Sequence, residues 1–325
     1  MRPGPRSRPR SRLRPAHNDA TEGYVVALDR GRFTCLVGER EVVAVRAREL
    51  GRKAVVVGDR VALVGDVSGT TDTLARLVRV EERTSLLRRS ADDSDPVERP
   101  IVANANQLGI VCAVANPEPR TRLIDRYLIA AFDGGLEPLL ILTKADLASP
   151  QGLIDSYALL DLRVVVTHHR EPGDDLRELL SDRVTVLAGH SGVGKSTLIN
   201  ALVPGAFRAT GDVNEVTGRG RHVSTSTVVL DLPGGGRVID TPGIRSFGLG
   251  HIDVNRVVSA FPDLAPGTAE CPRGCTHLRP SAEAMADDEI ASCALDDWVA
   301  TGHADPARLD SLRRLLSVGE RAEGG

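Results

Sequence analysis

Short apolar runs separated by glycine and charged residues fill the chain from Gly23 to about Leu87. Several short strands at regular spacing, with no convincing helical periodicity, are typical of a small all-β domain. We therefore expect a small β-barrel here, with an open β-sandwich as the alternative. The predicted strands are 23–28, 31–38, 40–47, 59–65 and 73–80.

From Ile101 the pattern changes to apolar strands that alternate with amphipathic helices. Such alternation predicts a mainly parallel sheet with helices on both faces. The predicted strands are 108–115, 138–144, 163–167, 184–189, 227–232 and 237–240, and the predicted helices run from about Thr121 to Gly134-Gly135, near 151–160, near 174–181 and from Lys195. After about residue 250 the chain is helical and acidic.

These changes divide the chain into four parts, so the fold class is multidomain α/β. The polar, proline-ended stretch 91–100 is the first linker candidate. We expect an arginine- and proline-rich disordered tail over 1–20, the barrel over 21–90, a Rossmann-like α/β domain over 91–250 and a helical domain over 251–325.

The charge of the chain is distributed unevenly. The formal net charge is −3, yet residues 1–90 carry +8 and the remainder carries −11. This asymmetry indicates an N-terminal part that faces a polyanion. Only three of the 41 basic residues are lysines, namely Lys53, Lys144 and Lys195. A lysine that survives in an arginine background suggests a position where the broad planar guanidinium does not fit.

Composition also bears on location. No apolar run approaches the roughly 18–20 residues of a membrane-spanning helix, and the N-terminus lacks the apolar region of a secretory signal. Five cysteines without such a signal indicate a reducing compartment, where clustered cysteines more often bind metal than form disulfides. We expect a cytoplasmic protein that does not contact a membrane.

The segment from Gly189 to Ser196 fits the pattern G-x-x-x-x-G-K-[ST] between a predicted strand and helix. Backbone N–H groups of such a loop bind phosphates, the lysine reaches the β- and γ-phosphates, and the serine ligates Mg²⁺. The predicted phosphate-binding residues are Gly189, His190, Ser191, Gly192, Val193, Gly194, Lys195, Ser196 and Thr197.

A second motif, D-x-x-G, extends from Asp240 to Gly243 at the end of a predicted strand. An aspartate at this position holds Mg²⁺, usually through water. Gly243 would allow its backbone N–H to approach the γ-phosphate.

A third motif, Thr143-Lys144-Ala145-Asp146, is a variant of the base-reading pattern [NT]-K-x-D. The carboxylate of Asp146 can accept hydrogen bonds from N1–H and the 2-amino group of guanine, which adenine does not offer. The lysine stem would lie against the base, while Thr143 lacks the amide of the more common asparagine. Thr167 and His168, after the next strand, are candidates for a further contact with guanine.

The order of these motifs is unusual, because the base-reading motif precedes the phosphate loop. A closed α/β sheet can be opened at a different loop and rejoined where its ends lie close together. We therefore expect a circularly permuted GTP-binding domain that uses GTP, GDP and Mg²⁺.

Three potential zinc ligands, Cys271, Cys275 and His277, fall within seven positions, and Cys293 follows after a loop. A Cys₃His set would close a tetrahedral structural site around one Zn²⁺, with unmetallated core or redox thiols as the alternative. Cys35 and Cys112 lie within apolar strand patterns and are expected in the core.

With these motifs assembled, the chain resembles the family of small-ribosomal-subunit-dependent GTPases, RsgA (YjeQ). The resemblance covers nearly everything after residue 20: an OB-fold-like barrel, a permuted GTPase domain with GHSGVGKST, DTPG and TKAD, and a zinc domain followed by the helix 308–316. It implies a GTPase that acts late in maturation of the 30S subunit, binds 16S rRNA and is stimulated by that subunit. We expect it to act as a monomer.

The resemblance also makes His222 the candidate for orienting the attacking water, because Ile244 follows D-x-x-G where many GTPases carry glutamine. The alternative is that His222 binds RNA or solvent on a mobile loop. The Mg²⁺-sensing hydroxyl is assigned to Thr225, with Ser224 as the alternative. Two other functions stay open: an rRNA-binding placeholder whose hydrolysis is incidental, and an unrelated P-loop ATPase or kinase.

Overall fold

The computed structural model describes residues 17–29, 31–50, 55–89, 99–168, 171–206, 227–241, 249, 252–279 and 293–320. The chain forms two compact units. The first contains the chain up to Val55 together with Arg60–Glu82, and the second contains Val56–Asp59 and the chain from Arg83 onward.

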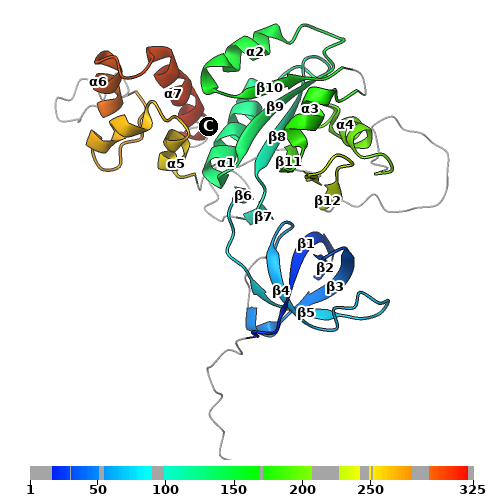
Figure 1. The fold of residues 1–325 in the computed structure, drawn as a ribbon. Helices are drawn as coiled ribbons and strands as arrows, with labels where there is room; N and C mark the ends of the chain where they lie inside the picture. The colour runs from blue at the N-terminus through cyan, green and yellow to red at the C-terminus, as the bar shows by residue number, and fades with distance from the viewer. Residues whose placement is uncertain are drawn as a thin grey trace, which may run out of the picture. The chain divides into compact units, whose positions relative to one another are not determined.

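The first unit is a closed five-stranded barrel, drawn in blue and cyan in Figure 1. Its strands pair in the order β1-β2-β3-β5-β4, and β1 also pairs with β4 to close the ring. Only the β3–β5 pair is parallel. The closed ring confirms the predicted barrel and excludes the open sandwich. The strands are β1 Thr21–Asp29, β2 Arg32–Val37, β3 Arg40–Arg46, β4 Arg60–Gly65 and β5 Ala75–Val80, with a 3₁₀ turn, η1, at Arg48–Leu50.

Alternation along these strands produces the core of the barrel. Phe33 and Cys35 on β2 point inward with Val42 and Ala44 on β3, while Arg32 is exposed. Because side chains alternate between the two faces of a strand, the arginines and threonines between the core positions face outward. Cys35 is fully buried, which confirms its predicted place in the core.

The second unit contains a six-stranded sheet in the order β10-β9-β8-β11-β13-β12. All neighbouring pairs are parallel except β12–β13. The predicted mainly parallel sheet is therefore confirmed. Its strands are β8 Gln107–Ala113, β9 Glu137–Thr143, β10 Arg163–Val166, β11 Val184–Ala188, β12 Val228–Asp231 and β13 Arg237–Asp240.

Helices cover both faces of this sheet. The chain passes from β8 through α1 to β9 and through α2 to β10, which lies at one edge of the sheet. It then passes through α3 in the opposite direction across the sheet, to β11. Right-handed crossovers therefore place α3 on the face opposite α1 and α2. Leu176 and Leu180 of α3 share a core with Leu198 of α4. The helices are α1 Thr121–Gly134, α2 Gln151–Tyr157, α3 Asp174–Leu180 and α4 Lys195–Leu202, and a 3₁₀ turn, η2, follows α2 at Ala158–Leu160.

A short antiparallel ribbon, β6 Leu86–Arg89 and β7 Arg99–Ala103, is a feature that the sequence pattern did not indicate. Both strands belong to the second unit, so the chain passes from the first unit to the second between Glu82 and Arg83. The buried carboxylate of Asp59 accepts two hydrogen bonds from the guanidinium of Arg83 at 2.7 and 2.9 Å. The domain boundary at residue 90 lies outside the described residues and stays a prediction.

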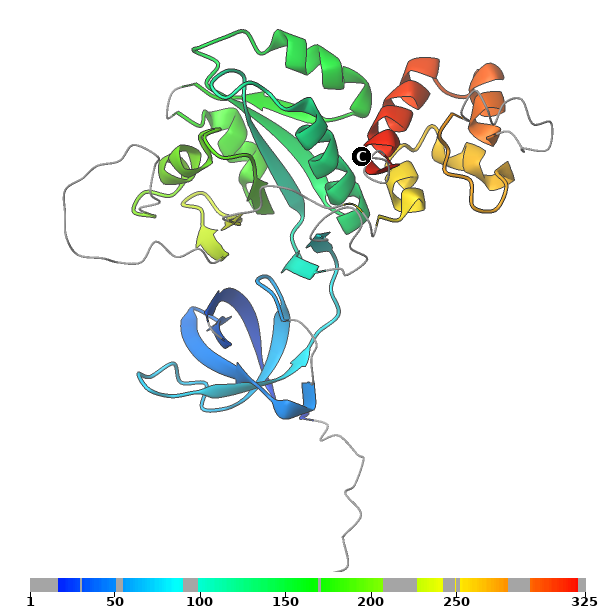
Figure 2. The ribbon, with the colours of Figure 1, turned by 180° about the vertical axis from the view of Figure 1, so that it is seen from behind.

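The C-terminal part of the second unit is helical, as expected. It contains α5 Val254–Ser259, a 3₁₀ turn η3 at Ala265–Glu270, α6 Ala294–Ala300 and α7 Pro306–Glu320. Helix α7 contains the predicted helix 308–316 and packs beside α1, as both ribbon views show (Figures 1 and 2). Among the described helices, none combines the length and the apolar character needed to cross a bilayer.

Candidate nucleotide and metal sites

The loop between β11 and α4 has the backbone geometry of a phosphate-binding loop. Gly192 and Gly194 have φ of 82° and 94°, a region that side chains other than glycine rarely adopt. A Cβ on Gly189 would lie 2.6 Å from the carbonyl oxygen of Val111. The loop therefore requires its glycines, and it leads into the N-terminus of α4, where backbone N–H groups of a helix bind anions.

Lys195, the first residue of α4, donates a hydrogen bond to the carboxylate of Asp240. Asp240 ends β13 and is 4% exposed. Because β13 lies beside β11, in a register that pairs Leu187 with Asp240, the carboxylate reaches the phosphate loop. A buried carboxylate is stable when a cation or hydrogen bond donors face it, and Lys195 is one such partner. Ser196 follows within the first turn of the same helix.

A pocket of about 280 Å³ opens next to the phosphate loop. It brings together the predicted base-reading motif, the loop after β10 and the first turns of α4. Thr167 and His168 also line it, and their contact with guanine stays a prediction. The lining residues are Thr143, Lys144, Asp146, Leu147, Thr167, His168, Glu171, Gly194, Thr197 and Leu198.

Two residues of the base-reading motif bind the phosphate loop directly. The Thr143 hydroxyl donates to the carbonyl oxygen of Val193 at 2.5 Å and lies 3.3 Å from that of Cys112. The ammonium of Lys144 donates to the carbonyl oxygens of Gly192, at 2.8 Å, and of Asn116. The hydroxyl of Thr143 thus makes a loop contact despite the missing amide.

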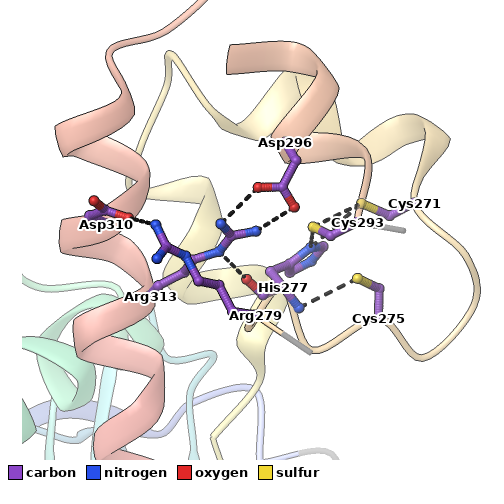
Figure 3. Close-up of polar contacts among 8 residues, drawn as sticks. All are labelled: Cys271, Cys275, His277, Arg279, Cys293, Asp296, Asp310 and Arg313. Carbon is purple, nitrogen blue, oxygen red and sulfur yellow. Dashed lines mark hydrogen bonds and ion pairs between the residues drawn. The ribbon is translucent and has the colours of Figure 1, made fainter. Parts of the chain in front are cut away.

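The four predicted zinc ligands converge at a second site (Figure 3). Their ligand atoms all lie within 4.8 Å of one another. Nδ1 of His277 is 3.5 Å from the sulfur of Cys271 and 3.6 Å from that of Cys293, and these two sulfurs are 4.0 Å apart. The sulfur of Cys275 accepts a hydrogen bond from the backbone N–H of His277 at 3.4 Å.

Burial favours the neutral form of two members of this cluster, Cys293 and His277. It raises the pKa of the Cys293 thiol to about 12, with a further contribution from the neighbouring Cys271 and Cys275. Burial and the nearby Arg313 lower the pKa of His277, which favours the neutral imidazole that metals bind. A cation at the centre would favour the thiolate of Cys293, whereas burial in the metal-free cluster favours its neutral thiol.

Sequence reasoning missed several residues at these sites. Leu147 and Glu171 line the pocket beside the predicted base-reading residues. The only sequence feature that could have identified them is that each follows the end of a strand, and many loop residues share that feature. Arg313 of α7 donates to the carbonyl oxygen of His277 at 3.0 Å, and nothing in the helical pattern of 308–316 distinguished it.

Some predicted residues lie outside the described part of the chain. These are His222, Ser224, Thr225, Gly243 and Ile244, together with the tail up to residue 16 and the segment 280–292. Their roles stay predictions.

Comparison with known proteins gives one consistent result. The family described as RsgA GTPase matches residues 80–250. A protein of Pseudomonas aeruginosa strain LESB58 named small ribosomal subunit biogenesis GTPase RsgA is 38% identical over 273 residues, which cover 81% of this chain and 76% of that protein. A protein of the same name from Ectopseudomonas mendocina is 37% identical, with coverage of 81% and 75%.

Two solved structures share the fold. YjeQ from Thermotoga maritima has a TM-score of 0.63 at 24% identity, covering 94% of this chain and 99% of its own. YloQ, described as a circularly permuted GTPase, has a TM-score of 0.62 at 24% identity, covering 95% and 99%. These structures confirm the predicted fold class, including the permuted order of the GTPase motifs.

Proposed function

Because the chain belongs to the RsgA GTPase family, we propose that it is a ribosome-stimulated GTPase acting in late maturation of the small ribosomal subunit. It hydrolyses GTP to GDP and phosphate, and hydrolysis times its release from the 30S subunit. One observation carries the nucleotide site: Asp146, Lys144 and the start of α4 line a single pocket beside the phosphate loop.

The pocket accounts for recognition of guanine. Asp146 accepts hydrogen bonds from N1–H and the 2-amino group, and an adenine ring would leave this carboxylate without a donor. The methylene stem of Lys144 would lie along the base, while its ammonium donates to the carbonyl oxygens of Gly192 and Asn116. Thr167 and His168 line the same pocket and would contact guanine from the loop after β10.

The part of the nucleotide site that would bind the phosphates contains the hydrogen-bonded pair Lys195 and Asp240. The loop N–H groups bind phosphate oxygens, and Lys195 exchanges Asp240 for the β- and γ-phosphates. Mg²⁺, when bound, neutralises the charge that develops on these phosphates. Ser196, Asp240 and Thr225 would hold it, since hydroxyl and carboxylate oxygens are the ligands that Mg²⁺ prefers.

Hydrolysis needs a group that positions water. His222 takes this role, because Ile244 neither donates nor accepts a hydrogen bond with its side chain. Gly243, with no side chain, would allow its backbone N–H to approach the γ-phosphate. Intrinsic turnover is therefore slow until the small subunit positions His222.

The barrel supplies the RNA-binding surface for 16S rRNA. Arg32 on β2 is paired with Val45 on β3, which in turn is paired with Arg76 on β5. Both arginines are exposed, so the outer face presents guanidinium groups from β2 and β5, on either side of β3. Guanidinium groups bind phosphate oxygens, which makes the interaction strongly dependent on salt.

The Cys₃His cluster binds one structural Zn²⁺. Tetrahedral zinc with Zn–S bonds of ~2.3 Å separates its sulfurs by about 3.8 Å. The spacings of 3.5 to 4.0 Å between the donor atoms of Cys271, His277 and Cys293 fit this geometry. Four protein ligands leave no open position, which suits a structural role. A protein that matures ribosomal subunits works in the cytoplasm, and we expect it to act as a monomer.

The test of this function is GTP hydrolysis by the full chain with and without purified 30S subunits. We expect turnover to rise when 30S subunits are added and ATP to compete poorly with GTP. Preferential binding of ATP would instead establish a different P-loop enzyme. Absence of stimulation by 30S subunits would contradict the ribosomal role.

A further inference from the structure

Arg313 is a buried cation placed against the proposed zinc site (Figure 3). Its side chain is only 8% exposed. Nε donates to the backbone carbonyl of His277 at 3.0 Å, and the two terminal nitrogens donate to the two carboxylate oxygens of Asp296 at 2.8 Å each. Asp296 lies on α6, three positions after Cys293. The guanidinium therefore contacts the segments that carry two of the four ligands.

The charge of a loaded site explains why a cation belongs there. Three thiolates and a neutral imidazole around Zn²⁺ leave a net charge of −1, and Asp296 adds another negative charge. A buried charge is costly unless it is paired and hydrogen-bonded. Arg313 offers a positive charge and a planar fork of donors that match a carboxylate and a carbonyl at the same time.

The helix that carries Arg313 also contacts the GTPase part of the second unit through two other arginines. Arg308 donates to the carbonyl oxygen of Leu159 at 2.6 Å and forms an ion pair with Asp161 at 2.8 Å. Arg314 donates to the carbonyl oxygen of Ser156 at 3.2 Å and lies 3.6 Å from the buried carboxylate of Asp125 on α1. One helix therefore joins the cysteine cluster to α1 and η2.

We propose that Arg313 is a positioning residue of the metal centre, through which the bound ion holds α7 against α1 and η2. The proposal rests on the proposed function only in requiring that the Cys₃His cluster binds zinc. Arg313 orients the His277 backbone and compensates the charge of the thiolates. Its position on α7 makes the metal centre and the docking contacts of Arg308 and Arg314 parts of one rigid element.

The test measures zinc affinity of the full-length protein by competition with a chromophoric chelator. Removing a residue that supports metal ligands from outside costs about 10- to 100-fold in affinity, and we expect that loss for Arg313→Gln. Arg313→Lys keeps the charge but not the fork, and should recover part of the affinity. Arg279→Gln is the matched control, because Arg279 also forms an ion pair with an aspartate, in its case Asp310 of α7, but is 70% exposed.

Hydrogen exchange provides the second measurement. In zinc-loaded Arg313→Gln, exchange should rise in α7 and in residues 151–160, whereas Arg279→Gln should match the wild type. A residue that only stabilises the fold would lower the unfolding temperature without changing zinc affinity. If Arg313→Gln does not fold, Arg313→Lys and Asp296→Asn carry the same comparison.

The outcomes separate the two claims. Wild-type protein that binds no zinc would contradict the metal site in the proposed function. Zinc-loaded wild type together with unchanged affinity in the Arg313 variants would overturn the role of Arg313 alone. Equal losses in the Arg279 control would also overturn it, since an exposed ion pair would then have the same effect.

Discussion

The hydroxyl of Thr143 donates a hydrogen bond to the carbonyl oxygen of Val193, fifty positions later in the chain. This bond joins the base-reading motif to the phosphate loop, so the two halves of the nucleotide site hold each other in place. Gly194, the residue after Val193, lines the pocket together with Thr143. A displacement of the base-reading loop would therefore also displace the phosphate loop.

Replacing Thr143 tests this connection. Thr143→Val keeps the shape of the side chain but leaves the Val193 carbonyl without this donor, which costs about 1–3 kcal/mol. We expect GDP to bind about 10-fold more weakly, measured by titration with a fluorescent analogue. Thr143→Asn should retain most of the affinity, because its amide can donate to the same carbonyl.

A matched control separates this effect from general destabilisation. Thr185 is buried in β11 and donates to the side chain of Gln107 at 2.9 Å. Thr185→Val should lower the unfolding temperature while GDP affinity is unchanged. Equal losses of affinity in both valine variants would contradict a specific link between Thr143 and Val193.

The residue proposed to position water gives the second prediction. His222→Ala should bind GTP within about twofold of wild type and lose roughly 100-fold in turnover stimulated by 30S subunits, the usual scale of a lost general base. Steady-state hydrolysis at saturating subunits measures it. Unchanged stimulated kcat would favour the alternative in which His222 contacts RNA or solvent.

Comparison of His222→Ala with Lys195→Ala tests whether subunit maturation requires GTP hydrolysis or only GTP binding. That variant loses charge-assisted bonds to the phosphates and should bind GTP at least about 100-fold more weakly. If only Lys195→Ala impairs subunit maturation in complementation assays, GTP binding is enough and hydrolysis is incidental. If both variants impair it, subunit maturation requires GTP hydrolysis itself.

The sequence predicted those features that repeat along the chain or form a motif. The phosphate loop, the D-x-x-G strand and the ligand cysteines have fixed spacing, and strands such as β8 are continuous apolar runs. The ribbon β6–β7 was missed because β6 ends in two arginines, and β7 begins with Arg99 and Pro100 inside the stretch expected to be a linker. Charged residues and proline at these positions conceal the strand pattern.

A second limit of prediction from sequence concerns charged residues on the buried side of α1. Asp125 and Asp133 are 4% and 5% exposed. Sequence patterns assign such residues to solvent, since Asp is almost never buried without a partner. Their partners, Arg314 for Asp125 and Arg256 for Asp133, come more than one hundred residues later. No local pattern connects residues at that separation.

Removal of a zinc ligand gives the third prediction. Wild-type protein should contain one zinc per chain by elemental analysis, and Cys275→Ser should lose most of it. Cys112→Ser is the control, because Cys112 is buried in β8 away from the cluster. A wild type without zinc, or an equal loss in both variants, would contradict the Cys₃His site.

The same site should respond to pH in a defined direction. Burial raises the pKa of Cys293 to about 12, so its thiol is protonated at neutral pH in the metal-free cluster. Zinc must displace that proton, and each proton released lowers the affinity about 10-fold per unit of falling pH. Competition titrations between pH 6 and 8 measure this slope, and a flat profile would show that the thiolates exist before zinc binds.

The last prediction concerns Asp125, where α7 meets α1. Burial raises the pKa of this carboxyl, while Arg314 and the hydroxyl of Tyr157, at 3.1 Å, act in the opposite direction. The folded state therefore holds the proton to higher pH than the unfolded state, whose carboxyl titrates near 3.8. The contribution of Asp125 to stability is then largest in acid and decreases as pH rises from that value through the raised pKa.

Asp125→Asn removes this titration while its side chain can still accept from Tyr157. We expect the unfolding free energy of the variant to improve relative to wild type as pH rises through this range, measured by urea denaturation at each pH. Asp310→Asn is the control, because Asp310 is 60% exposed in its ion pair with Arg279. A constant difference between Asp125→Asn and wild type across the pH range would mean that attraction to Arg314 offsets the cost of burial, so that docking of α7 does not depend on this proton.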